Sequence, residues 1–105
     1  MKQQDHFDIS TIPLWKVAIV VTSEPGYEME RVILVEDHPD WHDYILITGY
    51  HCSCYAFDET RWEATFGTAE EIRKIAQGWQ DAERIYLDAE TKAAPLILRH
   101  LKHCV

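Results

Sequence analysis

The chain has 105 residues, enough for one small domain, and 47% of them are apolar, 27% charged and 11% aromatic. This composition excludes a disordered, collagen-like or low-complexity chain, and the length leaves little room for a separate catalytic domain. The formal net charge of -8 argues against direct binding of nucleic acid, because a phosphate backbone repels an acidic surface.

The charges are unevenly distributed along the chain. Residues 1–71 hold fourteen Asp and Glu against four Lys and Arg, whereas residues 72–105 hold four against six. An acidic front half suits a partner with a basic surface, and the alternative is that the charge serves solubility alone.

The start of the chain and its cysteines indicate a compartment. Residues 1–8 contain no apolar core of a signal peptide, and the apolar run 14–21 is too short to span a bilayer. Cys52 and Cys54 are badly spaced for a mutual disulfide, and Cys104 leaves the cysteine count odd. We therefore expect a cytoplasmic protein with free thiols and no membrane contact.

The first part of the chain reads as a polar arm followed by strands. Residues 1–13 lack periodicity and end at a proline, so they are expected to form an N-terminal arm. The β-branched segments 14–22 and 29–36, joined by turn residues 24–27, predict a hairpin. Residues 44–48 predict a third strand ended by Gly49, and 50–57 either extend it or form a strand of their own. Alternation of Trp62, Ala64 and Phe66 predicts a fourth strand over 61–66.

The remainder reads as helices. Thr68 and Glu71 have the spacing of a capping box, and Gly78 is placed to end the helix that follows. Residues 82–89 predict a second helix, and Pro95 predicts a third that is capped at Thr91. The expected core-facing residues of the first and third helices are Ile72, Ile75, Ala76, Trp79, Ile97, Leu98, Leu101 and Val105.

Strands followed by helices predict an α+β fold. We expect an antiparallel sheet of about four strands, followed by two or three C-terminal helices packed on one face. Residues 14–105 would form this single domain, preceded by the arm 1–13.

Metal binding and catalysis have weak support in the sequence. His51 with Cys52 and Cys54, or His100 with His103 and Cys104, offers zinc-ligand types, but neither set has the usual pairing of four ligands. No nucleophile elbow, phosphate-binding loop or zinc-protease motif occurs. The expectation is a protein without catalytic residues, cofactor or metal; a small zinc-stabilised binding domain remains an alternative.

The aromatic and acidic residues between 37 and 62 are the better candidates for a site. On an extended segment His51, Tyr55 and Phe57 share one face, which indicates a binding surface, a second small core or a homodimer seam. The acidic residues proposed to steer a partner are Asp37, Asp40, Asp43, Asp58, Glu59 and Glu63. The candidate binding residues are Asp40, Trp41, His42, Asp43, His51, Tyr55, Asp58, Glu59 and Trp62.

The segment Tyr50-His51-Cys52-Ser53-Cys54-Tyr55-Ala56-Phe57, followed by Trp62-Glu63-Ala64-Thr65, resembles small uncharacterised bacteriophage and prophage proteins. The resemblance covers about residues 32–79 and brings no catalytic residues with it. It implies a phage accessory protein in the cytoplasm of an infected bacterium, and such proteins often inhibit host machinery, CRISPR systems included.

The expected function is therefore binding without catalysis. The leading hypothesis is an inhibitor of a host or defence protein that has a basic surface, with Trp41, Tyr55 and Trp62 as anchors. The alternative is an oligomer that sequesters a small nucleotide signal, using Arg31 and Arg61, with Arg73 or Lys74 from another subunit. A homodimer is compatible with either.

Overall fold

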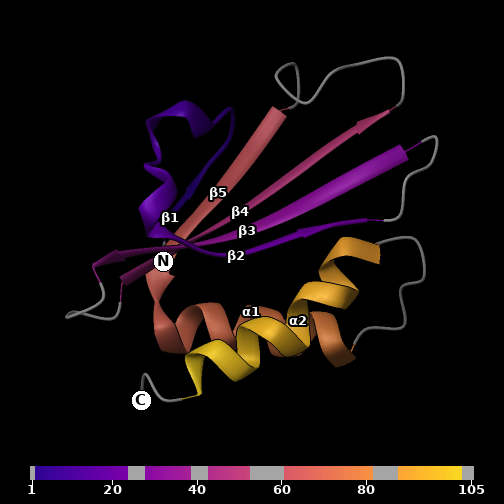
Figure 1. Ribbon diagram of the computed structural model, residues 1–105. Coiled ribbons are helices and arrows are strands. Elements are labelled where there is room, and N and C mark those ends of the chain that lie inside the picture. Colours follow the sequence, from indigo (N-terminus) through magenta and orange to yellow (C-terminus); the bar gives the residue numbers. More distant parts are fainter. Residues whose placement is uncertain (1, 24–27, 39–42, 53–60, 82–87, 103–105) are drawn as a thin grey trace.

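The computed structural model describes residues 2–23, 28–38, 43–52, 61–81 and 88–102, with the backbone alone at residues 28, 29, 38, 50–52, 61 and 88. One antiparallel sheet has the strand order β1-β5-β4-β3-β2 and is followed by two helices. Figure 1 shows both helices on one face of the sheet. The strands are β1 (Lys2–Gln4), β2 (Val17–Thr22), β3 (Glu28–His38), β4 (Asp43–Cys52) and β5 (Arg61–Thr68); the helices are α1 (Ala69–Asp81) and α2 (Asp88–Leu101), and two 3-10 turns are η1 (Ile9–Thr11) and η2 (Leu14–Lys16).

The predicted α+β class, with helices on one face, is confirmed, and the sheet has one strand more than expected. No helix in the described ranges is both long and apolar enough to cross a membrane.

The helical face of the sheet covers the larger core. Successive strand residues point to opposite faces, so Val32 and Leu34 of β3 face the helices, and so do Tyr44 and Leu46 of β4. The predicted apolar face of α1 is confirmed, and Ile97 and Leu101 of α2 are fully buried. Two small residues of α2, Ala89 and Ala93, are also buried in this core and let the helix pack closely.

The opposite face of the sheet covers a second core. Ile33 and Val35 of β3 lie here, and the predicted one-sided strand of Trp62, Ala64 and Phe66 is confirmed, with Phe66 partly buried at the margin. Phe7, Ile9 and Ile12 pack over this face, and the N–H of Phe7 donates to the Trp62 carbonyl at 2.8 Å. A sheet with apolar residues on both faces needs a cover on each.

The N-terminal residues therefore differ from the loose arm that was expected. Residues 2–4 form the edge strand β1, with Lys2 opposite Phe66 and Gln4 opposite Ala64. The ring of Phe7 meets Phe66 edge to face, with centroids 6.0 Å apart and an interplanar angle of 71°. The spaced apolar residues of this polar segment fit the second core, which local periodicity does not reveal.

Two strand boundaries also differ from the prediction. The first predicted strand starts at Val17, because residues 14–16 form η2. β4 passes through Gly49 without a change of register and ends at Cys52, so Gly49 does not end the strand. Ladder pairing with β3 and β5 on both sides maintains it.

Two helix boundaries were also wrong. α1 continues past Gly78 to Asp81, and Trp79 still packs partly against the helical-face core. α2 begins at Asp88, so Pro95 lies inside the helix and Thr91 is not its cap. Burial of Ala89 and Ala93 draws this earlier turn into the helix, while Pro95 is exposed. The predicted helix over 82–89 lies mostly outside the described residues.

Candidate binding surface

The structure describes only part of the predicted site. Six of its residues lie outside the described ranges: Asp40, Trp41, His42, Tyr55, Asp58 and Glu59. Asp43 begins β4 and His51 lies near its other end, where its backbone pairs with Met29. At about 3.3 Å per strand residue their backbones are roughly 25 Å apart. Asp43 and His51 therefore belong to different ends of the sheet.

Trp62 is not the surface anchor that the sequence suggested. Its exposed fraction is 5%, and it packs in the second core. Its register partner on β4 is Gly49, which has no side chain to compete for the space on that face. The apolar runs 32–35 and 44–47 are the sequence signal for this outcome, because such runs are typical of strands buried on both faces.

A shallow, open pocket lies where β3 ends, β4 and α1 begin, and β5 ends. Its volume is about 410 Å³. Three carboxylates from three different elements line it: Asp37 of β3, Asp43 of β4 and Glu71 of α1. We call these three residues the acidic end. The remaining lining residues are Lys2, Tyr44, Phe66, Gly67 and Thr68.

Glu71 is held at the pocket by the predicted capping box. The backbone N–H of Thr68 donates to Glu71 Oε1 at 3.1 Å, and the N–H of Glu71 donates to Thr68 Oγ1 at 3.3 Å. The donor from Thr68 is the main reason why the pKa of Glu71 is lowered from its ordinary value. Glu71 is therefore ionised at neutral pH and adds negative charge to the pocket.

Asp37 and Asp43 differ in their surroundings. Lys16 Nζ lies 3.2 Å from Asp37 Oδ1, and both side chains are partly exposed. Within the described ranges Asp43 makes no such ion pair. The acidic end thus combines a carboxylate paired with Lys16, a carboxylate held by the capping box, and Asp43 at the start of β4.

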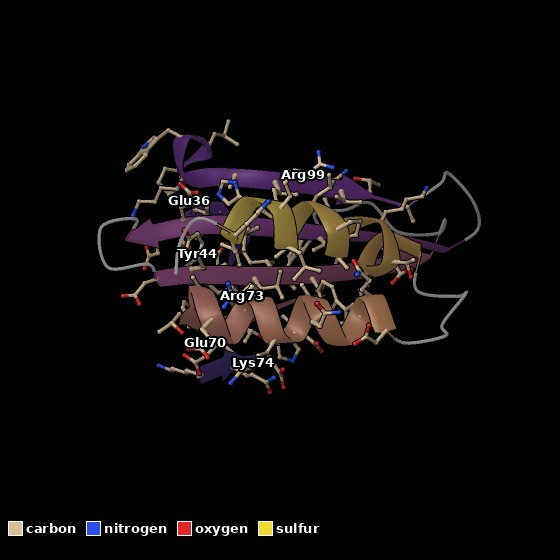
Figure 2. All side chains as sticks on the ribbon, turned by 90° about the horizontal axis from the view of Figure 1, so that it is seen from below. Glu36, Tyr44, Glu70, Arg73, Lys74 and Arg99 are labelled. Atoms are coloured by element: carbon tan, nitrogen blue, oxygen red, sulfur yellow. The ribbon has the colours of Figure 1, made fainter. Side chains whose placement is uncertain are left out.

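A histidine contact connects the helix layer with this end of the sheet. His100, in the last turn of α2, contacts the carboxylate of Glu36, which is paired with Tyr44 across the sheet. Figure 2 shows Glu36 and Tyr44 near the same end of the sheet. His100 belonged to one zinc alternative; no group of three metal-ligand side chains occurs in the parts of the chain that are described. Cys54, His103 and Cys104 lie outside those parts.

The structure also shows exposed apolar residues that sequence reasoning placed inside a strand. Leu14 and Trp15 of η2 are 88% and 81% exposed, and the Lys16 ammonium lies 5.3 Å from the centroid of the Trp15 ring. Val20 of β2 and Leu96 of α2 are also exposed.

Comparison of the chain with protein-family models, curated proteins and solved structures found no match in any of the three.

Proposed function

We propose that this protein acts by binding, as an inhibitor whose acidic end docks on a basic surface of a host or defence protein. The observation that carries the proposal is the convergence of Asp37, Asp43 and Glu71 on one pocket. Each comes from a different element, so only the folded chain collects their charge.

The chemistry of this pocket suits a lysine or arginine side chain of the partner. Carboxylates attract and hydrogen-bond an ammonium or guanidinium group, while Tyr44 and Phe66 offer apolar surface to its methylene stem. The net charge of -8 adds long-range steering toward a basic partner. Such steering raises the association rate and is screened by salt.

The class of partner rests on the sequence resemblance. Residues 50–57 and 62–65 resemble small phage accessory proteins. A basic surface on a host or defence protein, at the place where nucleic acid would dock, is the target that an acidic inhibitor from such a source would compete for.

The test uses a fluorescently labelled peptide rich in lysine and arginine as the model of a basic surface. Binding is followed by fluorescence anisotropy at several salt concentrations. We expect the wild-type chain to bind and to lose affinity as salt rises. The double variant Asp37→Lys/Asp43→Lys, which reverses two charges of the acidic end, should bind at least about tenfold more weakly, with a flatter salt dependence.

The matched control is Asp5→Lys/Asp81→Lys, which changes the net charge by the same amount at two exposed positions. Asp5 lies between Gln4, which is paired with Ala64, and Phe7, which donates to the Trp62 carbonyl, and Asp81 ends α1. Both positions are therefore away from the acidic end. We expect the control to lose much less affinity. Equal losses in the two double variants would show that net charge alone attracts the peptide and would remove the acidic end from the interface.

A further inference from the structure

The four exposed large apolar residues among those described lie on elements at the β2 edge of the sheet. Leu14 and Trp15 lie in η2, which leads directly into β2, and Val20 lies in β2 itself. Leu96 lies on α2, which packs against β2 and β3. Figure 2 shows α2 running along β2, with Arg99 beside that strand. Val20 is paired with Ile33 of the second core and so points away from the helices, whereas α2 lies on the other face. Exposed apolar residues therefore flank this edge on both faces of the sheet, as they would at an edge-to-edge interface.

β2 is an edge strand, and one side of its backbone can pair with a further strand. β2 ends the strand order, and in the described ranges it pairs with β3 alone. The N–H of Ser23 donates to the Glu30 carbonyl at 2.9 Å, so Ser23 and Val21 turn their polar groups toward β3. In an antiparallel ladder the alternate residues, Val20 and Thr22, then direct theirs outward.

The side chains of this edge carry little protection against pairing. Edge strands are usually blunted by charged residues, proline or a bulge. β2 has the sequence Val-Ala-Ile-Val-Val-Thr, without charge or proline, and its only such feature is a register shift between Val17 and Ile19. The regular edge is thus the short stretch Ile19–Thr22.

We propose that this edge is the interface of a homodimer, in which β2 of one copy pairs antiparallel with β2 of the other around a two-fold axis. Antiparallel pairing of identical strands is self-complementary, and an uncharged strand brings no like charges together at its centre. The start of each β2, with Leu14 and Trp15, lies against the end of the partner's β2. The two α2 helices come together beneath the joined sheet, with Leu96 at their contact.

The available area is sufficient for a weak dimer. Taking large side chains as about 150–250 Å² each, the exposed fractions of the four residues amount to roughly 500 Å² per copy. Two copies would bury about 1,000 Å² before the backbone is counted, near the lower limit for a specific interface. We therefore expect association that depends visibly on protein concentration.

The salt dependence separates this dimer from the proposed binding of a basic partner. Each copy carries a net charge of -8, so two copies repel each other and salt strengthens their association by screening. Binding of a basic surface weakens under the same change. The two proposals can therefore be tested separately: the chain could bind the basic peptide without dimerising, or dimerise without binding the peptide.

Analytical ultracentrifugation over a wide range of protein concentrations tests the interface. We expect a monomer–dimer equilibrium for the wild-type chain that shifts toward dimer as salt rises. Val20→Lys and Trp15→Ala should each raise the dimer dissociation constant at least about tenfold. The control Gln80→Lys, an exposed position on α1, adds the same charge as Val20→Lys and should leave the constant unchanged.

Trp15→Ala protects the test against a folding defect, because an indole that is 81% exposed contributes little to the monomer fold. A monomer at every concentration, or a dimer that neither edge variant weakens, would overturn the proposal. Dimerisation lost equally in the Gln80→Lys control would also overturn it.

Discussion

Trp62 and Trp15 show how differently the fold treats two residues of the same type. Trp62 is 5% exposed within the second core, and Trp15 is 81% exposed in η2. The neighbouring residues do not predict this difference in exposure. Trp15 stands between Leu14 and Lys16, and Trp62 stands between Arg61 and Glu63, so each has a charged neighbour in the sequence. The difference depends on which residues of the sheet face a cover.

Trp62→Ala should therefore lower the free energy of unfolding by about 3–5 kcal/mol, through lost burial and the cavity left behind. Trp15→Ala is the matched control and should change it by less than about 1 kcal/mol. Urea denaturation at low protein concentration, where a dimer contributes least, measures both. Equal effects of the two substitutions would contradict the burial of Trp62.

At the scale of the element, the start of α1 is the feature that sequence and structure agree on most closely. Thr68 and Glu71 exchange two hydrogen bonds across the first turn, as their spacing predicts. The same helix passes through Gly78, where an added Cβ would meet nothing within 4 Å. The start of the helix is set by hydrogen bonds between residues that are close in sequence. Its end depends on how far along the helix apolar side chains, such as Trp79, still pack against the sheet.

The capping box makes the stability of α1 depend on pH. The pKa of Glu71 is lowered in the folded chain, chiefly by the backbone N–H of Thr68. Its contribution is therefore complete above the ordinary glutamate pKa and is lost as pH falls through the lower value of the folded state. The stability difference between the wild-type chain and Glu71→Gln should shrink over that acidic range.

Thermal unfolding as a function of pH measures this difference. Thr68→Ala serves as a companion, with an expected loss of about 1 kcal/mol at neutral pH. A difference between wild type and Glu71→Gln that stays constant down to the lowest pH would show that the carboxylate charge does not stabilise the helix start.

At the scale of the whole molecule, two different layers close the sheet. α1 and α2 cover one face, and the short segment with Phe7, Ile9 and Ile12 covers the other. This second cover is thin, and its packing against Trp62 and Phe66 joins the beginning of the chain to β5.

Phe7→Ala should therefore destabilise the chain by about 2–4 kcal/mol, although Phe7 lies outside the predicted domain boundary of residue 14. Leu14→Ala, at an 88% exposed position, is the control and should have little effect. Chemical denaturation compares the two. A Phe7 variant as stable as the Leu14 variant would mean that the N-terminal segment is a dispensable arm.

The two proposed surfaces are also a property of the whole molecule. The acidic end collects carboxylates from β3, β4 and α1, and the apolar edge follows η2, β2 and α2. Their opposite responses to salt allow both to be measured on the same preparation. Of the predicted acidic and binding residues that the structure describes, Asp37 and Asp43 line the pocket, whereas Trp62 lies in the second core.

The amino-acid sequence was sufficient to predict the class of fold, the positions of strands β3 and β5, and the start of α1, because these depend on side-chain period and local hydrogen bonds. The tertiary structure decided the burial of Trp62, the pairing of residues 2–4 with β5 and the passage of β4 through Gly49. It also carried α2 across Pro95, where burial of Ala89 and Ala93 outweighs a missing backbone donor. These outcomes depend on contacts between segments far apart in the chain, whose free energy local propensity does not contain.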